Sequence, residues 1–385
     1  MTSTAADNSP LRVAILGTRG IPARYGGFET FAEQLAVRLA RRGVAVTVYA
    51  EGAAGSSPSC ADYRGVRVQS IPVPRWGAAS VIAYDMRSVW HARRGFDLVY
   101  MLGYGAAFAC WLPRAFGTPV WINMDGLEWA RSKWSAPARL WLRLMEWTAT
   151  WAATRLIADA RAIERHIQKT YPRAAPCSFI AYGAEVRQQT PDAALLAAWG
   201  VERQRYFLVV ARVEPENHVE EAVDAYQRYR DLGGTAALVV VGDVHGGSAY
   251  SRRVHSRQVP GLHWLGAVYE AHVLENLRLG ALAYLHGHSV GGTNPSLLEA
   301  LGCGNLVIAH RNVFNEEVLG ELGWYFHTPA ELAERMHEVE SIGADERSRR
   351  QQAAWTCIEA RYSWPGVAAA YEKLMREAVG QEPVA

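Results

Sequence analysis

The sequence predicts an α/β protein made of two doubly wound, Rossmann-like domains that face each other across a cleft. Short apolar runs typical of buried strands alternate with helical segments along the whole chain, and this alternation indicates parallel sheets covered by helices. Glycine-rich loops follow several of the apolar runs. The chain has 385 residues, which is too long for one small core, so two domains are expected.

The domain boundaries are expected in turn-rich sequence. A first domain should span residues 10–183 and a second residues 184–355, with the link between them running from Ala181 to about Val201. Residues 356–385 are expected to form a helical segment that packs back on the first domain.

Composition and charge narrow the class of protein further. No apolar run approaches the roughly 18 residues of a membrane span, and the polar, small residues from Met1 to Pro10 do not resemble a secretion signal. The five cysteines are odd in number and lack CxxC spacing, which indicates reduced thiols in a cytoplasmic protein. The net charge is +9 through Glu185 and −7 from Val186 onward. The first half should therefore face an anionic partner, and without a nucleic-acid-binding motif we expect no nucleic acid.

The first domain opens with a βαβ unit. A buried strand is expected from Arg12 to Gly17, and a loop from Thr18 to Thr30 leads into a helix. The loop lacks the G-x-G-x-x-G spacing of dinucleotide-binding domains, which argues against a dehydrogenase.

Two glycines stand at the end of this first loop. Gly26 and Gly27 at a helix start can hold a phosphate, with Arg19 and Arg24 close by in the sequence. Alternatively, the glycines only form a turn, and the residues leave both readings open.

Acidic residues follow the next predicted strands. Strands are expected at Asp97 to Leu102 and at Pro119 to Met124, and the second ends in Asp125 and Glu128. Ligands of open parallel sheets bind outside the carboxyl ends of the strands. Either carboxylate could accept a hydrogen bond from a substrate hydroxyl or act as a base, unless Asp125 caps the following helix.

The segment from Trp129 to Arg155 is rich in tryptophan and arginine. Four apolar residues have helical spacing and are expected to face the core: Leu140, Leu144, Trp147 and Trp151. The residues left for another surface are Trp129, Trp134, Arg131, Lys133, Arg139 and Arg143. Basic charge beside interfacial aromatic rings is typical of a peripheral contact with an anionic membrane. The alternative is a core helix with a solvated basic face.

The second domain repeats the pattern of strands and polar loops. A strand from Tyr206 to Ala211 ends in Arg212, which is placed either for a phosphate or on an ordinary surface. Another strand leads into a glycine-rich loop from Asp243 to Gly247. After a third strand, a nucleotide base could lie against Val268 and Tyr269.

The most informative stretch of the second domain follows the apolar run from Leu282 to Leu285. It passes the glycine pair Gly291-Gly292 before Asn294-Pro295 opens a helix, since Asn is a good N-cap and Pro suits the first helical position. A glycine-rich loop before a helix start makes an anion site. Glu299, about one turn into the helix, could accept hydrogen bonds from a sugar hydroxyl of the same ligand. The alternative is an ordinary crossover with Glu299 in solvent.

The second half resembles the nucleotide-binding domain of glycosyltransferase family 4, whose members are retaining enzymes with the GT-B fold. The matching positions are Arg212, Leu265 to Val268, Glu299 and Gly302-Cys303-Gly304. The resemblance implies that Arg212 neutralises the leaving diphosphate and that Glu299 contacts the ribose. Two positions depart from the family pattern, because Gly291 replaces the usual first Glu of an E-x7-E pair and Asn217 replaces a Lys.

A subgroup is indicated by motifs that lie far apart in the chain. The stretches 17–30, 125–129 and 291–296 resemble the bacterial β-1,4-rhamnosyltransferases of polysaccharide assembly. This resemblance implies dTDP-L-rhamnose as donor, a lipid-diphosphate-linked saccharide as acceptor and a peripheral position on the cytoplasmic face of the membrane. The alternatives are UDP-glucose, UDP-N-acetylglucosamine or GDP-mannose as donor, a sugar-nucleotide epimerase of the same fold, or a non-catalytic nucleotide-binding protein.

The expected site thus draws on both domains. The expected residues are Arg212, Glu299 and Asp125 for catalysis; Gly26, Gly27, Val268, Gly291, Gly292, Thr293 and Asn294 for the nucleotide sugar; and Arg19, Arg24 and Glu128 for the acceptor. No metal or other cofactor is expected, because no ligand cluster is evident. His286 and His288, near a strand end, are more often packed or bonded to backbone than bound to a metal.

Overall fold

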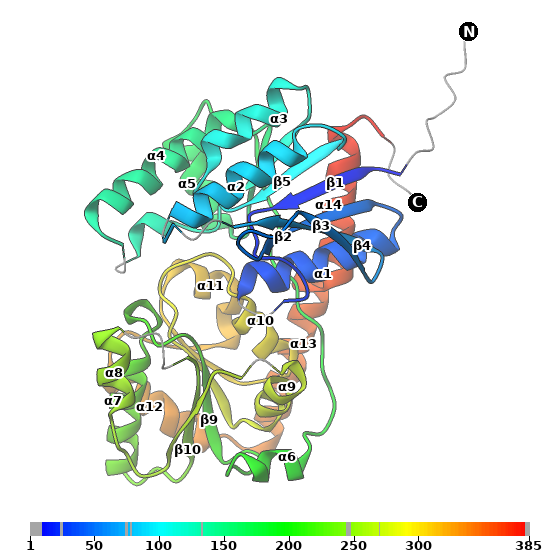
Figure 1. The fold of residues 1–385 in the computed structure, drawn as a ribbon. Coiled ribbons are helices and arrows are strands. Elements are labelled where there is room, and N and C mark those ends of the chain that lie inside the picture. Colours follow the sequence, from blue (N-terminus) through cyan, green and yellow to red (C-terminus); the bar gives the residue numbers. More distant parts are fainter. Residues whose placement is uncertain are drawn as a thin grey trace.

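The computed structural model describes residues 10–23, 26–73, 76, 77, 79–131, 134–243, 248–268 and 270–381. It contains two α/β domains, shown one above the other in Figure 1, each built on a mainly parallel sheet. The predicted fold class is therefore confirmed.

The sheet of the first domain has the strand order β3-β4-β2-β1-β5-β6-β7-β8, with only β3 antiparallel to its neighbour. The strands are β1 (Arg12–Leu16), β2 (Ala45–Gly52), β3 (Ser59–Tyr63), β4 (Val66–Pro72), β5 (Leu98–Leu102), β6 (Val120–Asn123), β7 (Arg155–Ala158) and β8 (Cys177–Phe179). The helices are α1 (Gly27–Arg41), α2 (Ala79–Ala92), η1 (Ala107–Cys110), α3 (Trp111–Ala115), η2 (Glu128–Ala130), α4 (Ala136–Ala152) and α5 (Arg161–Thr170). Helices cover both faces of the sheet, so central strands such as β5 are buried throughout and are apolar without alternation.

The sheet of the second domain has the strand order β11-β10-β9-β12-β13-β14, and all of its strands are parallel. The strands are β9 (Tyr206–Val210), β10 (Ala237–Val241), β11 (Leu262–Gly266), β12 (Ala283–His286), β13 (Val307–His310) and β14 (Trp324–Phe326). The helices are α6 (Ala193–Ala198), η3 (Pro215–Asn217), α7 (Val219–Asp231), α8 (Ala249–His255), α9 (Ala271–Gly280), α10 (Pro295–Gly302), α11 (Val313–Leu319), η4 (Gly320–Leu322), α12 (Pro329–Glu340) and α13 (Ala344–Cys357). The strand order reverses between β9 and β12, and ligands of doubly wound sheets bind at such a switch point.

Helix α4 buries a different face from the one that its sequence predicts. The four residues expected in the core, Leu140, Leu144, Trp147 and Trp151, are 44% to 70% exposed. The helix instead buries Leu142, Met145, Ala149 and Ala152 against the rest of the domain. The prediction was wrong because α4 has two apolar faces, and the face with small alanines can approach the sheet more closely.

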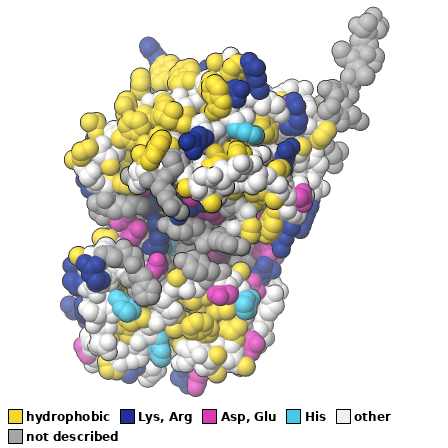
Figure 2. All heavy atoms as spheres, in the orientation of Figure 1, with side chains coloured by type: hydrophobic (Ala, Val, Ile, Leu, Met, Phe, Trp, Pro, Cys, Tyr) yellow, Lys and Arg dark blue, Asp and Glu magenta, His cyan; other side chains and the backbone are white. Residues whose placement is uncertain are grey.

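Exposed apolar side chains are concentrated on the first domain. All but two of the large exposed apolar side chains among the described residues lie between positions 76 and 151, and the two exceptions are Leu232 and Val313. Figure 2 shows apolar side chains gathered over the upper domain, where Figure 1 places α2, α3 and α4. No helix in the described ranges is long and apolar enough to cross a membrane.

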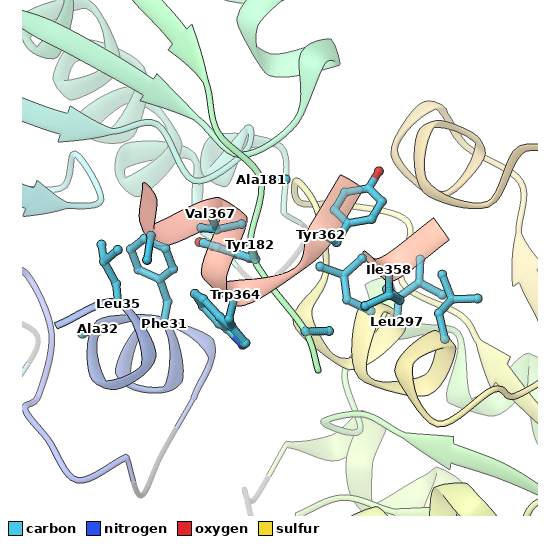
Figure 3. Close-up of a cluster of buried hydrophobic side chains, with 14 of the residues drawn as sticks. Phe31, Ala32, Leu35, Ala181, Tyr182, Leu297, Ile358, Tyr362, Trp364 and Val367 are labelled. Carbon is cyan, nitrogen blue, oxygen red and sulfur yellow. The ribbon is translucent and has the colours of Figure 1, made fainter. Parts of the chain in front are cut away.

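The end of the chain returns to the first domain. After the π-helical turn η5 (Ile358–Tyr362), helix α14 (Trp364–Ala378) packs against α1. The ring of Phe31 on α1 lies 6.2 Å from that of Trp364 and 5.8 Å from that of Tyr371. Figure 3 shows this cluster continuing into Leu297 of the second domain, so one apolar core spans both domains.

Candidate active site between the domains

The carboxyl ends of the two sheets face each other, and a cavity of about 610 Å³ lies between α1 of the first domain and α9 and α10 of the second. Its lining includes Arg38 and Tyr182 from the first domain and Arg278, Pro295 and Glu299 from the second. A cavity of this size and position is the default place for a ligand in a two-domain α/β protein.

Two helix N-termini meet beside this cavity, which Pro295 lines. A Cβ atom on Gly27, the first residue of α1, would lie only 3.6 Å from Cγ of Pro295, the first residue of α10. Asn294 caps α10 as predicted, since its side chain accepts a hydrogen bond of 2.9 Å from the Ser296 amide. Gly26 caps α1 without a side chain. The partial positive charges of the two N-termini therefore lie close together, and they favour the binding of an anion beside Gly27 and Pro295.

The two domains approach each other closely at the predicted glycine loop before α10. Gly291 has a φ of +134°, which only glycine adopts readily, and it packs on the backbone of Gly126. A side chain on Gly292 would collide with the Asp159 carboxylate, and the Thr293 hydroxyl donates a hydrogen bond of 2.5 Å to the Asp159 carbonyl oxygen. Small residues are therefore required here by contact between the domains, in addition to any role with a ligand.

Arg212 follows β9 and reaches into solvent. Its side chain is 56% exposed, with Nη1 3.4 Å from Glu214 Oε1. Asn217, at the position where the sequence resemblance implies a Lys, is buried and donates a hydrogen bond of 2.8 Å to the Arg212 carbonyl oxygen. It closes the turn that carries Arg212 and brings no charge of its own.

Glu299 has a partner that the sequence did not suggest. Its Oε2 atom lies 2.6 Å from Nη2 of Arg278, a buried side chain on α9. The ion pair fixes the orientation of the carboxylate at the edge of the cavity. No local pattern could reveal the pair, because its two residues belong to different helices.

The two acidic residues after β6 have different surroundings. The amide of Asp125 donates a hydrogen bond of 2.8 Å to Asn123 Oδ1, and the following helical turn starts from Leu127 without a side-chain cap, so Asp125 does not cap it. Glu128, expected at the acceptor, receives a hydrogen bond of 3.0 Å from Trp134 Nε1 and pairs with Arg131 at 2.6 Å. Its carboxylate therefore holds local structure in place.

Arg131 lies in the cleft and not on the membrane-facing surface expected from the sequence. Its side chain is only 15% exposed. Burial acts to lower the pKa of Arg131, but the charges of Glu128 and Asp125 more than offset burial and raise it. Glu216 and Glu214 of the second domain add to this effect, so the guanidinium bridges the two domains electrostatically.

Arg19 and Val268, also expected in the site, do not line the cavity. Arg19 is half exposed, lies 4.0 Å from Glu51, and is held through its amide by Glu29. Val268 is buried just after β11. Four stretches named in the sequence predictions lie outside the described residues: Arg24, Lys133, residues 244–247 and Tyr269.

Asp159 is a residue of this region that the sequence analysis missed. It follows β7 as Asp125 follows β6, is 1% exposed, and has no hydrogen-bond partner for either carboxylate oxygen among the described residues. The sequence does contain a signal that predicts this site. Leu-Ile-Ala before Asp159 is a short apolar run typical of a buried strand, and an acidic residue follows it directly.

Four histidines lie close together near the strand ends beside Arg212. The rings of His286 and His288 stack with centroids 4.5 Å apart, and those of His218 and His310 with centroids 4.3 Å apart. Burial, with the nearby charges of Arg131 and Arg212, lowers the pKa of His288 to about 3. Burial also lowers the pKa of His286. His286 and His288 are therefore neutral at pH 7. The described ranges contain no group of three or more His, Cys, Asp or Glu side chains that could hold a metal ion.

Each domain matches a known protein-family model. Residues 196–355 match the model of glycosyl transferases group 1. Residues 11–185 match a domain of unknown function, DUF1972. No curated protein matches the sequence significantly.

Several solved structures share the whole fold. Sucrose-phosphate synthase from Thermosynechococcus elongatus has a TM-score of 0.79 at 16% identity, covering 96% of this chain and 99% of that one. Trehalose 6-phosphate synthase from Burkholderia multivorans and a glycosyltransferase from Rickettsia africae each have a TM-score of 0.72 at 13% identity, covering 97% of this chain and 99% of theirs. The family match and the shared fold confirm the predicted enzyme class, a GT-B glycosyltransferase.

The buried histidines predict a loss of stability in acid. An unfolded imidazole titrates near pH 6.5, so below that pH the unfolded chain binds protons that the folded protein excludes from His288. His288 should therefore make the protein easier to unfold as the pH falls from about 6.5 towards 4, with a contribution of about 2 kcal/mol at pH 5. The measurement is the urea midpoint of unfolding at pH 7, 6 and 5.

His288→Asn should make this pH dependence shallower, whereas His272→Asn, at an exposed position on α9, should leave it unchanged. Comparison with the wild type cancels Asp159 and Asp85, whose raised pKa values act in the opposite direction. Equal slopes for wild type and His288→Asn would contradict the prediction.

Proposed function

We propose that the protein transfers L-rhamnose from dTDP-L-rhamnose, with retention of configuration, to a lipid-diphosphate-linked saccharide at the cytoplasmic face of a membrane. The observation that carries the transferase site is the meeting of the α1 and α10 N-termini at Gly27 and Pro295. The choice of rhamnose rests on the sequence motifs at 17–30, 125–129 and 291–296.

The leaving diphosphate is bound where the helix N-termini converge. Helix dipoles and backbone amides stabilise the negative charge that develops as the sugar leaves, and such preorganised groups usually give the largest catalytic term. Arg212, exposed on the same side of the second domain, adds a mobile positive charge. Glu299, oriented by Arg278, accepts a hydrogen bond from the 3′-hydroxyl of the deoxyribose.

The chemical step needs no protein nucleophile. The bond between the anomeric carbon and the phosphate oxygen breaks, the acceptor oxygen bonds to the same face of that carbon, and the acceptor proton moves to the departing phosphate oxygen. Asp125, at the carboxyl end of β6, orients the acceptor hydroxyl. Neither a metal nor another cofactor takes part in this scheme.

A lipid-linked acceptor requires the enzyme to reach a membrane surface, and the first domain offers one. We call the group Trp90, Trp111, Leu140, Leu144, Trp147 and Trp151 the apolar face; all six side chains are exposed. They belong to α2, α3 and α4, which contact one another directly or through η1. Exposed apolar area of this extent marks an interaction site in most proteins.

Several arginines lie beside the tryptophan and leucine side chains of the apolar face. Arg93 lies over the ring of Trp90 at 4.3 Å and Arg114 over that of Trp111 at 5.2 Å. Arg139 and Arg143 are exposed on α4. Tryptophan and arginine together are suited to the boundary between headgroups and acyl chains of an anionic membrane.

A donor screen tests the proposed activity. Wild-type protein is incubated with dTDP-rhamnose, UDP-glucose, UDP-N-acetylglucosamine or GDP-mannose and a lipid-diphosphate-linked acceptor, and products are separated by chromatography. We expect transfer from dTDP-rhamnose. Transfer from another donor only would contradict the sugar assignment, interconversion of a donor without acceptor would indicate an epimerase, and the lack of transfer and hydrolysis with every donor would contradict the enzyme class.

Arg212→Ala should lower kcat by roughly 100-fold, the scale expected for loss of one strong transition-state contact. Asn217 supplies no second positive charge in this turn, so little compensation is expected. Arg349→Ala, which removes an exposed arginine on α13, is the matched control and should keep the wild-type rate. A near wild-type kcat for Arg212→Ala at saturating donor would show that the diphosphate is held elsewhere.

The membrane proposal predicts reversible, salt-sensitive binding to vesicles. Wild type should co-sediment with vesicles containing phosphatidylglycerol more than with phosphatidylcholine alone, and less at high salt, because salt screens exposed charges. Leu140→Ser combined with Leu144→Ser and Trp147→Ser should reduce binding at least tenfold. Leu232→Ser, at an exposed leucine on the second domain, should not. Equal binding to both vesicle types, or full binding by the triple variant, would contradict the proposal.

A further inference from the structure

Asp159 is the side chain whose surroundings the proposed mechanism leaves unexplained. Its carboxyl group is fully buried, and neither oxygen has a hydrogen-bond partner among the described residues. Burial raises the pKa of this carboxyl well above its usual range, and the charge of Asp125 adds to the effect. An ionisable group held in this way destabilises a folded protein, so a role confined to packing would suit an uncharged residue better.

The place of Asp159 connects it with the glycine loop before α10. Its carbonyl oxygen accepts the hydrogen bond from Thr293, and its carboxylate lies against Gly292. Gly291 and Gly292 carry no side chains, so this part of the second domain offers no acidic group to a ligand. The first domain brings the carboxylate to the position instead.

The loop and Asp159 belong to different domains and can therefore separate. The chain crosses between the domains twice, and the two crossings are bonded to each other: the Ala184 amide donates to the Tyr362 carbonyl at 2.7 Å, and the Trp364 amide donates to the Ala184 carbonyl at 3.4 Å. Rotation about this paired crossing would draw Gly292 away from Asp159 and open a space between the carboxylate and the loop.

We propose that Asp159 binds the transferred sugar, with its carboxylate accepting hydrogen bonds from hydroxyl groups of that sugar when the cleft opens to admit the donor. The inference rests on the proposed function, since it places the diphosphate at the N-terminus of α10 and the sugar beside it. Opening of the cleft exposes Asp159 to water and removes the burial that raises its pKa, so that the group ionises. The carboxylate can then accept several hydrogen bonds in different directions, which suits vicinal hydroxyls. Asp159 then contacts the sugar but not the nucleotide.

The test compares nucleotide with nucleotide sugar. Isothermal titration calorimetry gives the Kd of dTDP, dTDP-rhamnose, UDP and UDP-glucose for wild type, Asp159→Asn and Asp159→Ala. We expect nucleotide affinities within about twofold of wild type and a nucleotide-sugar affinity at least tenfold weaker, as for loss of a hydrogen bond to a charged group. In the kinetic assay both variants should raise the KM for the donor. Asp97→Asn, at the opposite end of the same sheet, is the control, because Asp97 pairs only with Arg12 in the described contacts.

The melting temperature shows whether a variant that binds no ligand is still folded. Asp159→Asn should raise the melting temperature by about 2–4 °C, because it removes a buried carboxyl without a partner while keeping its shape. A lower melting temperature with parallel losses for nucleotide and nucleotide sugar would overturn the inference and leave Asp159 a packing residue. Unchanged nucleotide-sugar affinity in both variants would also overturn it. Failure of the wild type to bind any of the four ligands would instead contradict the proposed function itself.

Discussion

The backbone contact between the two domains at the glycine pair Gly291-Gly292 is the constraint on which the other features depend. Gly126 of the first domain and Gly291 of the second approach too closely for a side chain at position 126, and Gly292 meets the Asp159 carboxylate. Because these glycines let the carboxyl ends of both sheets come together, the N-termini of α1 and α10 also become neighbours. The anion site proposed here is therefore a product of domain contact, and neither domain forms it alone.

The two domains are joined by helix α14 and by the two segments in which the chain crosses between them. Helix α14 follows the second domain but completes the core of the first, where Tyr371 and Tyr100 share a hydrogen bond of 3.0 Å. Gly183 packs directly on the ring of Trp364, which places the two crossings side by side. On the other side of the cleft, Glu317 of the second domain accepts hydrogen bonds from the first amides of α5. One side of the cleft is thus closed by the paired crossing, which can act as a hinge. The other side is closed by the hydrogen bonds of Glu317, which rotation of the domains can break.

Local sequence patterns predicted the strands, the helices and the fold class, but not the contacts between elements. The strands, the Asn294 cap and the fold followed from apolar runs and from Asn-Pro chemistry. The orientation of α4 did not follow, because periodicity finds an apolar face without saying whether that face meets the core or the solvent. Arg131 in the cleft, Arg278 beside Glu299 and the buried Asp159 depend on partners distant in the chain.

The central claim, that the diphosphate of a nucleotide sugar binds where the two helix N-termini meet, is tested most directly by a crystal structure with dTDP. The account predicts density for the diphosphate between Gly27 of α1 and the Thr293-Asn294 amides, with the 3′-hydroxyl of the deoxyribose against Glu299. Nucleotide bound outside this cleft, or bound within it with the deoxyribose far from Glu299 and the diphosphate away from both helix starts, would contradict the account.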